Sequence, residues 1–251
     1  MTAPLLETED LRKSFGRLAA VAGVSVSFPE GVLTAVIGPN GAGKTTLINL
    51  LTGLLLPDGG TIRFKGQDIT RLPPHRRVRL GLSRSFQIMT IFPNLTVRQN
   101  LLLPTLSRRG LSGRALSPVA SLPGAAREAD DILRETGLSE QQEVRAATLS
   151  HGDQRLLELG IAVATQPELC FLDEPCAGMN PVERQAVLGL MRKLAAERRT
   201  TFVVVEHDMD VVFALAQRIV VMNYGQVLAD GTPAEIREDQ KVREIYLGAE
   251  V

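Results

Sequence analysis

The sequence predicts an α/β fold with an N-terminal antiparallel β subdomain and an inserted helical subdomain. In the second half of the chain, strand-like apolar runs alternate with helical stretches, which is typical of βαβ units around a buried parallel sheet. Residues 5–37 instead contain short strand-like runs separated by glycine and proline, a pattern that favours antiparallel pairing. Between these regions, residues 95–159 lack strand signals and show helical periodicity.

The composition excludes several classes of protein. A hydrophobic content of 44% and a charged content of 22% are those of an ordinary globular protein, not of a disordered or fibrous one. The net charge is zero, so we expect no nucleic-acid partner, which would demand a basic surface. No apolar run reaches the roughly 18 residues of a membrane-spanning helix, and no secretory signal is recognisable. We therefore expect a soluble, cytoplasmic protein.

The N-terminal region predicts a β meander. The runs LLETEDLRKSF, VSVSF and VLTAVI are separated by Gly16, Gly23, Pro29 and Gly31, so we expect a small antiparallel sheet. A glycine-rich turn, a helix from about Lys44 and a further strand around residues 61–64 come next.

The helical stretch interrupts the core in sequence. It contains a loop rich in Gly, Ser, Pro and Arg at residues 107–124. After it, the strand-like runs LCFLD, TFVVVE and RIVVM alternate with the helical runs PVERQAVLGLMRKLAAE and DMDVVFALA. No repeat or linker is evident, so we expect residues 1–251 to form one unit, with a core of about 1–88 and 160–251 and a helical subdomain of about 89–159.

Residues 38–45 form a phosphate-binding motif. Their sequence GPNGAGKT fits G-x-x-x-x-G-K-[ST] between the apolar strand LTAVI and the helical run TTLINLLTG, and this context supports the motif. In such a P-loop the backbone N–H groups face an anion, Lys44 neutralises the outer phosphates and Thr45 offers a hydroxyl to Mg²⁺. A P-loop NTPase core of the RecA-like type follows, with ATP, GTP and kinase substrates all open at this point. The predicted nucleotide-binding residues here are Gly38, Pro39, Asn40, Gly41, Ala42, Gly43, Lys44, Thr45 and Thr46.

Asp173 and Glu174 end the apolar run LCFL. A buried strand that ends in acids delivers carboxylates to the carboxyl edge of the sheet, where ligands bind in such folds. Because adjacent side chains on a strand point opposite ways, the two acids can have different roles. We expect Asp173 to hold Mg²⁺, directly or through water, and Glu174 to orient and deprotonate the attacking water.

The sequence resembles the ATPase subunits of ABC transporters. The run LSHGD at residues 149–153 stands between the helical insert and the strand that ends at Asp173, where this family has its LSGGQ-type signature. The resemblance implies that Ser150 and Gly152 contact the γ-phosphate bound to the P-loop of a second cassette. Residues 1–251 would then be a single ABC ATPase cassette, two of which sandwich two ATP molecules as a homodimer or heterodimer. A kinase or GTPase would lack this signature.

Other positions agree with the family in the same order. The resemblance assigns Phe15 to stacking on adenine, Gln87 to the Q-loop, residues 175–180 to the D-loop and His207 to the switch position after TFVVVE. Alone, Phe15 would be a core aromatic, Gln87 a surface amide and His207 a structural histidine, so their order carries the assignment. The implied catalytic residues are Glu174, His207 and Gln87, and the implied metal ligands are Thr45, Gln87 and Asp173.

The signature departs from the family pattern at two positions. His151 replaces glycine and Asp153 replaces glutamine. A carboxylate near a triphosphate opposes binding by Coulomb repulsion unless Arg155 or another cation screens it.

Further runs resemble the ATPases of branched-chain amino-acid importers. These are RSFQ and FPNLTV within residues 84–97, AGMNP at 177–181 and IYLG at 245–248. The implied function is ATP-driven import of branched-chain or related amino acids. Urea or amide import, lipopolysaccharide export and a soluble, non-transport ABC ATPase remain alternatives.

The same resemblance implies the partners and the location. The partners are a second cassette, transmembrane permease subunits and, indirectly, a periplasmic or extracellular solute-binding protein. The location is the cytoplasmic face of the inner membrane, as a peripheral subunit. Residues 88–100, which carry the apolar side chains of Ile88, Ile91, Phe92, Leu95 and Val97, either contact the permease or pack between subdomains.

Overall fold

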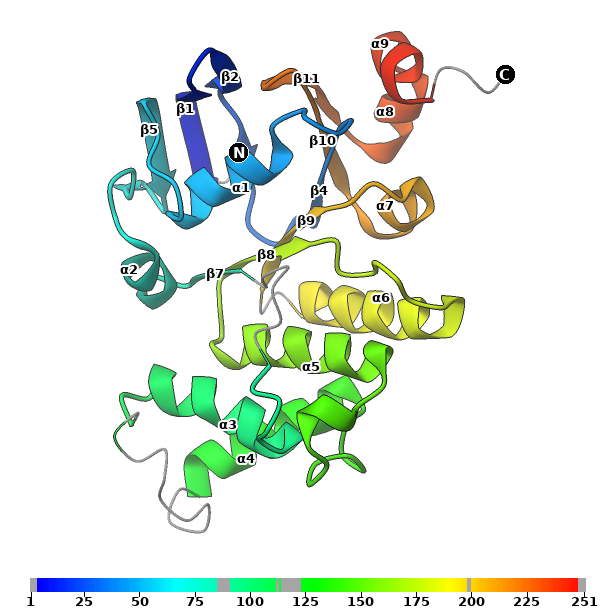
Figure 1. Cartoon of the computed structure of the whole chain (residues 1–251). Coiled ribbons are helices and arrows are strands. Elements are labelled where there is room, and N and C mark those ends of the chain that lie inside the picture. Colours follow the sequence, from blue (N-terminus) through cyan, green and yellow to red (C-terminus); the bar gives the residue numbers. More distant parts are fainter. Residues whose placement is uncertain (1–3, 85–90, 112, 114–122, 198–199, 248–251) are drawn as a thin grey trace.

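The structure, a computed structural model, describes residues 4–84, 91–111, 113, 123–197 and 200–247. In Figure 1 an antiparallel sheet and helix α1 lie in the upper part, a mostly parallel sheet crosses the middle, and a group of helices lies below. The predicted fold class, an α/β core with an antiparallel sheet and a helical insert, is confirmed. None of the described helices has the length and apolar character needed to cross a bilayer.

The antiparallel sheet is built from the N-terminal third of the chain. Its strand order is β2-β1-β5-β6, with the short β3 pairing with the start of β1. Every described pairing in it is antiparallel, as predicted. The strands are β1 Leu6–Phe15, β2 Leu18–Val24, β3 Ser27–Phe28, β5 Gly59–Phe64 and β6 Gln67–Asp68.

The larger sheet has the order β11-β10-β4-β9-β8-β7. Its strands are parallel except for the β10–β11 hairpin. The prediction that VLTAVI belongs to the meander is wrong, because β4 pairs in parallel with β9 and β10. All four residues of β4 are buried, which suits a central strand covered on both faces. The strands are β4 Thr34–Ile37, β7 Leu82–Arg84, β8 Leu169–Asp173, β9 Thr201–Val205, β10 Arg218–Asn223 and β11 Gln226–Gly231.

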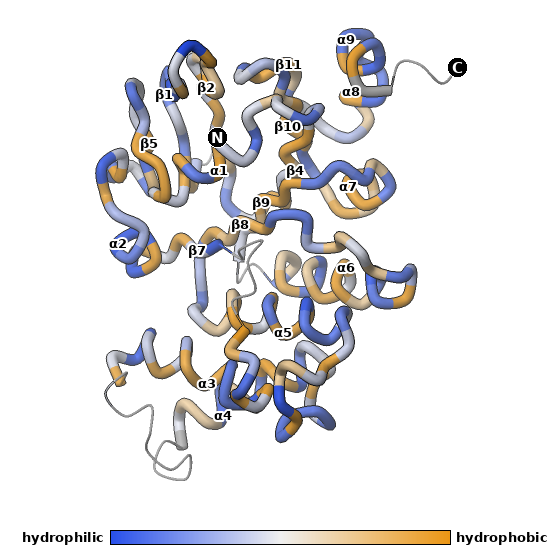
Figure 2. Tube along the Cα trace, in the orientation of Figure 1, coloured by the Kyte–Doolittle hydropathy of each residue, from blue (hydrophilic) through white to orange (hydrophobic). Residues whose placement is uncertain are grey.

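Helices cover both faces of the larger sheet. Alternate strand residues point to opposite faces, so Phe171 and Val203 pack with α1 under the antiparallel sheet, whereas Cys170 and Phe202 pack with α5, α6 and α7. Figure 2 shows these central strands as a mainly hydrophobic band. The helices are α1 Lys44–Thr52, α2 Pro74–Arg79, α3 Val97–Arg108, α4 Pro123–Thr136, α5 His151–Ala164, α6 Pro181–Ala196, α7 Met209–Leu215, α8 Pro233–Glu238 and α9 Gln240–Val242, with a 3-10 turn at Ala146–Thr148 and a π turn at Arg243–Leu247.

The helical insert has a hydrophobic cluster of its own. Helices α3 and α4 bury Leu101, Ala129 and Leu133 against Leu157 of α5. Further along α5, Leu159 belongs to the cluster on the sheet. Helix α5 therefore joins the insert to the core. We propose subdomain boundaries near residues 89 and 159 on this basis.

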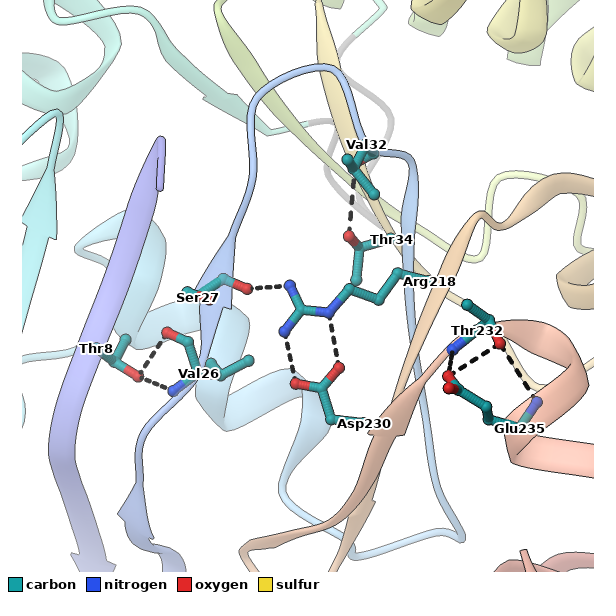
Figure 3. Close-up of polar contacts among 9 residues, drawn as sticks. All are labelled: Thr8, Val26, Ser27, Val32, Thr34, Arg218, Asp230, Thr232 and Glu235. Atoms are coloured by element: carbon teal, nitrogen blue, oxygen red, sulfur yellow. Dashed lines mark hydrogen bonds and ion pairs between the residues drawn. The ribbon is translucent and has the colours of Figure 1, made fainter. Parts of the chain in front are cut away.

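One arginine ties the two sheets together. Arg218 on β10 donates a hydrogen bond to the carbonyl oxygen of Ser27 on β3 and pairs with Asp230 on β11, at 2.6 Å from Nε to Oδ1 (Figure 3). A planar guanidinium makes such two-point contacts with a carboxylate. In the same view, the hydroxyl of Thr8 on β1 accepts from the N–H of Val26, at 3.0 Å.

Candidate nucleotide-binding and catalytic site

The P-loop lies where sequence reasoning expects it, between β4 and α1. Gly43 precedes α1 with φ 98°, a left-handed conformation that glycine adopts at little cost. The N-terminus of α1 directs its free N–H groups and positive end toward the loop, which suits an anion. Asn40, Gly41 and Thr45 are exposed, so this side of the loop is open to a ligand.

Lys44 folds back over its own loop. Its Nζ donates to the carbonyl oxygens of Gly38, at 2.6 Å, and Pro39, at 3.1 Å. Burial lowers the pKa of Lys44, and the negative charges of Glu174 and Asp173 oppose that shift. The ammonium group of Lys44 has lost part of its water, and the two carbonyl oxygens replace that water only weakly. A phosphate bound at the loop would give it an anionic partner and a stronger hydrogen bond.

Asp173 is the last residue of β8 and is 4% exposed. Arg84, at the end of β7, donates to its Oδ2 at 3.0 Å and also to the side chain of Asn49 on α1. Burial raises the pKa of Asp173, and Arg84 opposes the shift. Sequence reasoning assigned no role to Arg84 or Asn49, because a strand-end arginine and a helical asparagine carry no motif. The three side chains connect the sheet to the helix that follows the P-loop.

Glu174 lies just beyond β8 in a left-handed conformation with φ 48°. Its N–H still donates to the carbonyl oxygen of Val205, at 2.9 Å, at the end of β9. Its Oε1 lies 3.5 Å from Nδ1 of His207. A non-glycine residue in this region costs on the order of 1–3 kcal/mol and persists where its surroundings impose it, often at functional sites. The predicted base and the predicted switch histidine are thus brought together.

Glu206 is a buried carboxylate that sequence reasoning missed. It follows β9, is 3% exposed, and accepts from the N–H groups of Cys176 and His207, both at 3.3 Å. Burial raises the pKa of Glu206, and Glu174 adds to the increase. The signal was available, because the run TFVVV ends in an acid just as LCFL does. Glu206 joins the loop after β8 to the loop after β9.

The signature residues lie at the start of α5. Ser150 is exposed and caps the helix by accepting from the N–H of Asp153, at 3.1 Å. Gly152 is buried against α6, where a Cβ atom would lie 2.5 Å from Cγ of Glu183. Asp153 lies in the first turn of the helix, where the helix dipole favours an acid. Arg155 does not pair with it in this structure but bonds Glu158, at 2.7 Å.

Phe15 lies apart from these groups, at the end of the antiparallel strand β1. It is 49% exposed, so part of it is accessible for stacking, and Nζ of Lys13 lies over the ring at 5.8 Å from its centroid. Gln87 lies outside the described residues. Of the apolar residues predicted within 88–100, Ile88 also lies outside the described residues. Ile91 and Val97 pack inside the helical insert, whereas Phe92 is 54% exposed.

The residues present fit Mg²⁺ as well as a nucleotide. Mg²⁺ prefers hard oxygen ligands and keeps several water or phosphate oxygens. Thr45 offers an exposed hydroxyl at the start of α1, and Asp173 offers a buried carboxylate whose raised pKa reflects incomplete compensation of its charge. The site therefore combines a P-loop that can bind an anion, the carboxylate of Asp173 that can bind a cation, and the neighbouring side chains of Glu174 and His207.

Comparison with known proteins gives a consistent result. A family model described as ABC transporter matches residues 21–177, and one described as branched-chain amino acid ATP-binding cassette transporter matches residues 226–251. The chain is 41% identical over 255 aligned residues, with 99% of both chains covered, to the high-affinity branched-chain amino acid transport ATP-binding protein BraF of Pseudomonas aeruginosa. The corresponding LivG protein of Escherichia coli strain K12 has the same identity and coverage.

Solved structures agree with this. The ADP conformation of an ATP-binding cassette of an ABC transporter superposes with a TM-score of 0.85 at 35% identity, covering 99% of this chain and 100% of the other. A nucleotide-free ATP-binding cassette from an ABC transporter gives 0.84 at 34% identity, with 98% and 100% covered.

Proposed function

Because the chain belongs to the ABC transporter family, we propose that it is the ATP-hydrolysing subunit of an importer for branched-chain or closely related amino acids. The observation that carries this proposal is full-length similarity to branched-chain amino acid transport ATP-binding proteins, in a chain that places Lys44, Asp173 and Glu174 at one sheet edge. The subunit works at the cytoplasmic face of the membrane, bound to permease subunits. A solute-binding protein supplies the amino acid.

In the proposed reaction the residues of this chain bind ATP, orient the attacking water and remove a proton from it. The P-loop N–H groups and Lys44 hold the phosphates, and Phe15 stacks on adenine. Thr45, Asp173 and Gln87 hold Mg²⁺, which neutralises charge on the transferred phosphoryl group when bound. Glu174 takes the proton of the attacking water, and His207, 3.5 Å from its carboxylate, holds that carboxylate in place.

We propose that Ser150 and Gly152 act on the nucleotide of a second cassette. Helix α1 packs on one face of the larger sheet and α5 on the other. The N-terminus of α5, with its exposed Ser150, therefore serves a phosphate outside its own P-loop. The open and closed arrangements of the paired cassettes differ in their affinity for ATP. This difference allows ATP binding and hydrolysis to move the permease.

We propose Phe92 as a contact for the permease. The buried side chain of Asn100 accepts from the N–H of Phe92, at 2.8 Å, and donates to its carbonyl oxygen, at 3.1 Å, which leaves the aromatic ring exposed. Replacing Phe92 by Ser should leave the ATPase activity of the isolated chain within about twofold and abolish most of the stimulation by permease and solute. Val144→Ser, which changes another exposed side chain of the insert, is the control, and equal losses in both variants would exclude a specific contact.

The central test of hydrolysis is Glu174→Gln. The amide keeps the size of the side chain but cannot accept the proton of water, so we expect ATP binding to persist and turnover to fall at least about 100-fold. Glu168→Gln, at the opposite end of β8, makes the same chemical change outside the site and should hydrolyse ATP normally. Turnover by Glu174→Gln at the wild-type rate would remove Glu174 from the role of base.

The transported solute is tested in vesicles that contain this subunit with its permease, second cassette and binding protein. Leucine, isoleucine and valine should stimulate ATP hydrolysis and enter the vesicles. Stimulation by urea, or outward movement of lipopolysaccharide, would assign the subunit to one of the alternative transporters. Hydrolysis that neither permease nor solute changes would favour a soluble ABC ATPase.

A further inference from the structure

We propose that the turn between β10 and β11 positions the P-loop for nucleotide binding, with Gly225 as the positioning residue. This inference rests on the proposed ATP-binding function and adds a residue far from the loop in sequence. The N–H of Gly225 donates to the carbonyl oxygen of Ala42 in the P-loop, at 3.0 Å, and the carbonyl oxygen of Gly225 accepts from the N–H of Ala22 on β2, at 2.8 Å. The turn thus links the P-loop to the antiparallel sheet.

The first hydrogen bond orients a peptide group that faces the ligand. The carbonyl of Ala42 and the N–H of Gly43 belong to one planar trans peptide unit, so they point in opposite directions. Holding the carbonyl toward Gly225 directs the N–H of Gly43 away from the turn, toward the side where a P-loop binds phosphate. A displaced turn would rotate this unit and turn the N–H donor away from the phosphate.

Close backbone packing reinforces the link. A Cβ atom on Gly225 would lie 2.9 Å from the carbonyl oxygen of Ala20 on β2. A Cβ atom on Gly43 would lie 2.2 Å from that same oxygen and 3.4 Å from Cα of Gly225. At the start of the loop, a Cβ atom on Gly38 would lie 2.2 Å from the carbonyl oxygen of Met222 at the end of β10. Both ends of the P-loop therefore rest on the β10–β11 hairpin or on the strand beside it.

The backbone conformation of this turn suits Gly225 but not Tyr224. Tyr224 and Gly225 have φ angles of 45° and 75° between the paired residues Asn223 and Gln226, the signs of a type I′ turn, which prefers Asn, Asp or Gly at both central positions. Tyr224 adopts the left-handed region although the residue is 85% exposed and gains little from packing. The two-residue link between paired strands favours this geometry, and the hydrogen bonds of Gly225 with Ala42 and Ala22 fix where the turn lies against the P-loop and β2.

The chain contains a matched control for this proposal. The turn between β5 and β6 likewise has a non-glycine residue followed by a glycine, both with positive φ, Lys65 at 52° and Gly66 at 77°, but a Cβ atom on Gly66 would meet nothing within 4 Å. Gly225→Ala and Gly66→Ala therefore impose the same backbone penalty, and only the first displaces the P-loop. The variants are compared by calorimetric titration with Mg²⁺ and ATP, and by denaturant unfolding.

We expect Gly225→Ala to weaken ATP binding at least about tenfold, which corresponds to ~1.4 kcal/mol, while Gly66→Ala stays within about twofold of wild type. In hydrolysis, the KM for ATP should rise in Gly225→Ala while kcat at saturating ATP changes little, because no group that contacts the reacting water is altered. Equal ATP affinity in the two variants would overturn the proposal.

Hydrogen exchange on the wild-type chain gives a second test that does not depend on the folding of a variant. ATP should slow exchange of the Gly225 amide, which is bonded to the P-loop, and leave the Gly66 amide unchanged. Unchanged exchange at Gly225 in a chain that binds ATP would overturn the positioning role and leave the proposed function intact. A wild-type chain that binds no ATP would overturn both.

Discussion

Glu206 illustrates at the scale of a single residue how the loops around the site are held. Its carboxylate accepts from the N–H groups of Cys176 and His207, so one buried side chain connects the loops that follow two adjacent parallel strands. A carboxylate that bonds backbone donors fixes their position, but its burial disfavours the ionised form. The net result is a raised pKa for Glu206.

This raised pKa predicts how stability depends on pH. Below the ordinary glutamate pKa of 4.5, Glu206 is protonated in both the folded and the unfolded chain and adds no pH dependence. Above 4.5 the unfolded chain loses this proton first, so the contribution of Glu206 to the free energy of unfolding falls until pH passes the raised folded pKa. In Glu206→Gln this decrease is absent, because the amide does not titrate.

The measurement is denaturant unfolding of the nucleotide-free chain from pH 4.5 to 8, for the wild type and for Glu206→Gln. The amide offers one acceptor oxygen instead of two, which adds a constant loss at every pH. The difference between the two free energies of unfolding, variant minus wild type, therefore begins at this constant loss at low pH. It should become more positive as the pH rises. A difference that stays flat or falls would contradict burial as the dominant cause of the pKa shift.

Gly152 provides a second prediction for a single residue. The start of α5 approaches α6 so closely that a Cβ atom on Gly152 would lie 2.5 Å from Glu183, whose side chain caps α6 by accepting from the N–H of Asn180, at 3.1 Å. Gly152→Ala should displace this cap and lower the free energy of unfolding by ~1–2 kcal/mol. Adding Glu183→Ala should cost little more, because the cap is already lost and the space is freed.

A double-mutant cycle on unfolding free energies checks this coupling. An interaction energy of at least ~0.5 kcal/mol between Gly152→Ala and Glu183→Ala is expected, and additive losses would show that the close approach has no energetic weight.

The site residues that the sequence revealed are those whose neighbours along the chain carry the information. Lys44 lies in a contiguous motif, and Asp173 and Glu174 end an apolar strand, so both could be predicted from local patterns. Arg84 and Asn49 could not, because each acquires its role only when Arg84, Asp173 and Asn49, which are distant in sequence, meet at one sheet edge. Only the fold brings such partners together.

At the scale of the element, Arg77 holds the end of α1. Its side chain is 0% exposed, and its NH1 donates to the carbonyl oxygens of Leu50 and Leu51, both at 2.7 Å. It also donates to the carbonyl oxygens of Leu72 and Thr70, at 2.9 and 3.0 Å. A helix leaves its last carbonyl groups without hydrogen-bond donors, and here the buried guanidinium of Arg77 supplies those donors. Burial lowers the pKa of Arg77 to about 10, so it stays charged at neutral pH.

Replacing Arg77 by Met should lower the free energy of unfolding by about 3 kcal/mol, because four carbonyl groups, two of them in buried hydrogen bonds, lose the guanidinium donor. Arg76→Met changes the preceding residue of α2, which is exposed, and should stay within about 0.5 kcal/mol of wild type. Denaturant unfolding measures both. Equal small losses would show that other donors or water replace the guanidinium.

The prediction of elements succeeded where one periodicity dominates. β8, β9 and β10 are apolar runs that are buried on both faces, and the sequence predicts all of them. β4 was assigned to the wrong sheet because a short apolar run does not specify its partners. β2, with the sequence LAAVAGV, was missed, since its small residues and glycine give a weak strand signal. Its role is clear only in space, where Ala20 and Ala22 support Gly43 and Gly225.

At the scale of the whole molecule, the larger sheet separates the two surfaces that we propose to act on nucleotide. The P-loop and α1 lie on the face that carries the antiparallel sheet, and α5 with its exposed Ser150 packs on the opposite face. Figure 1 shows α1 above the sheet and α5 below it. If each surface is one half of a composite site, a single chain cannot complete a site by itself, and two chains complete two.

Mixing two inactive variants tests this composite arrangement. Lys44→Ala disables the P-loop half, and Ser150→Ala disables the signature half, so a dimer of either variant alone has two defective sites. In a mixed dimer both defects fall in one site, and the other site combines an intact Lys44 with an intact Ser150. Random pairing of equal amounts should therefore restore about a quarter of the wild-type active sites if two copies of this chain pair. ATP hydrolysis in the mixture should exceed that of either variant alone, and no recovery would contradict pairing of identical chains through these two surfaces.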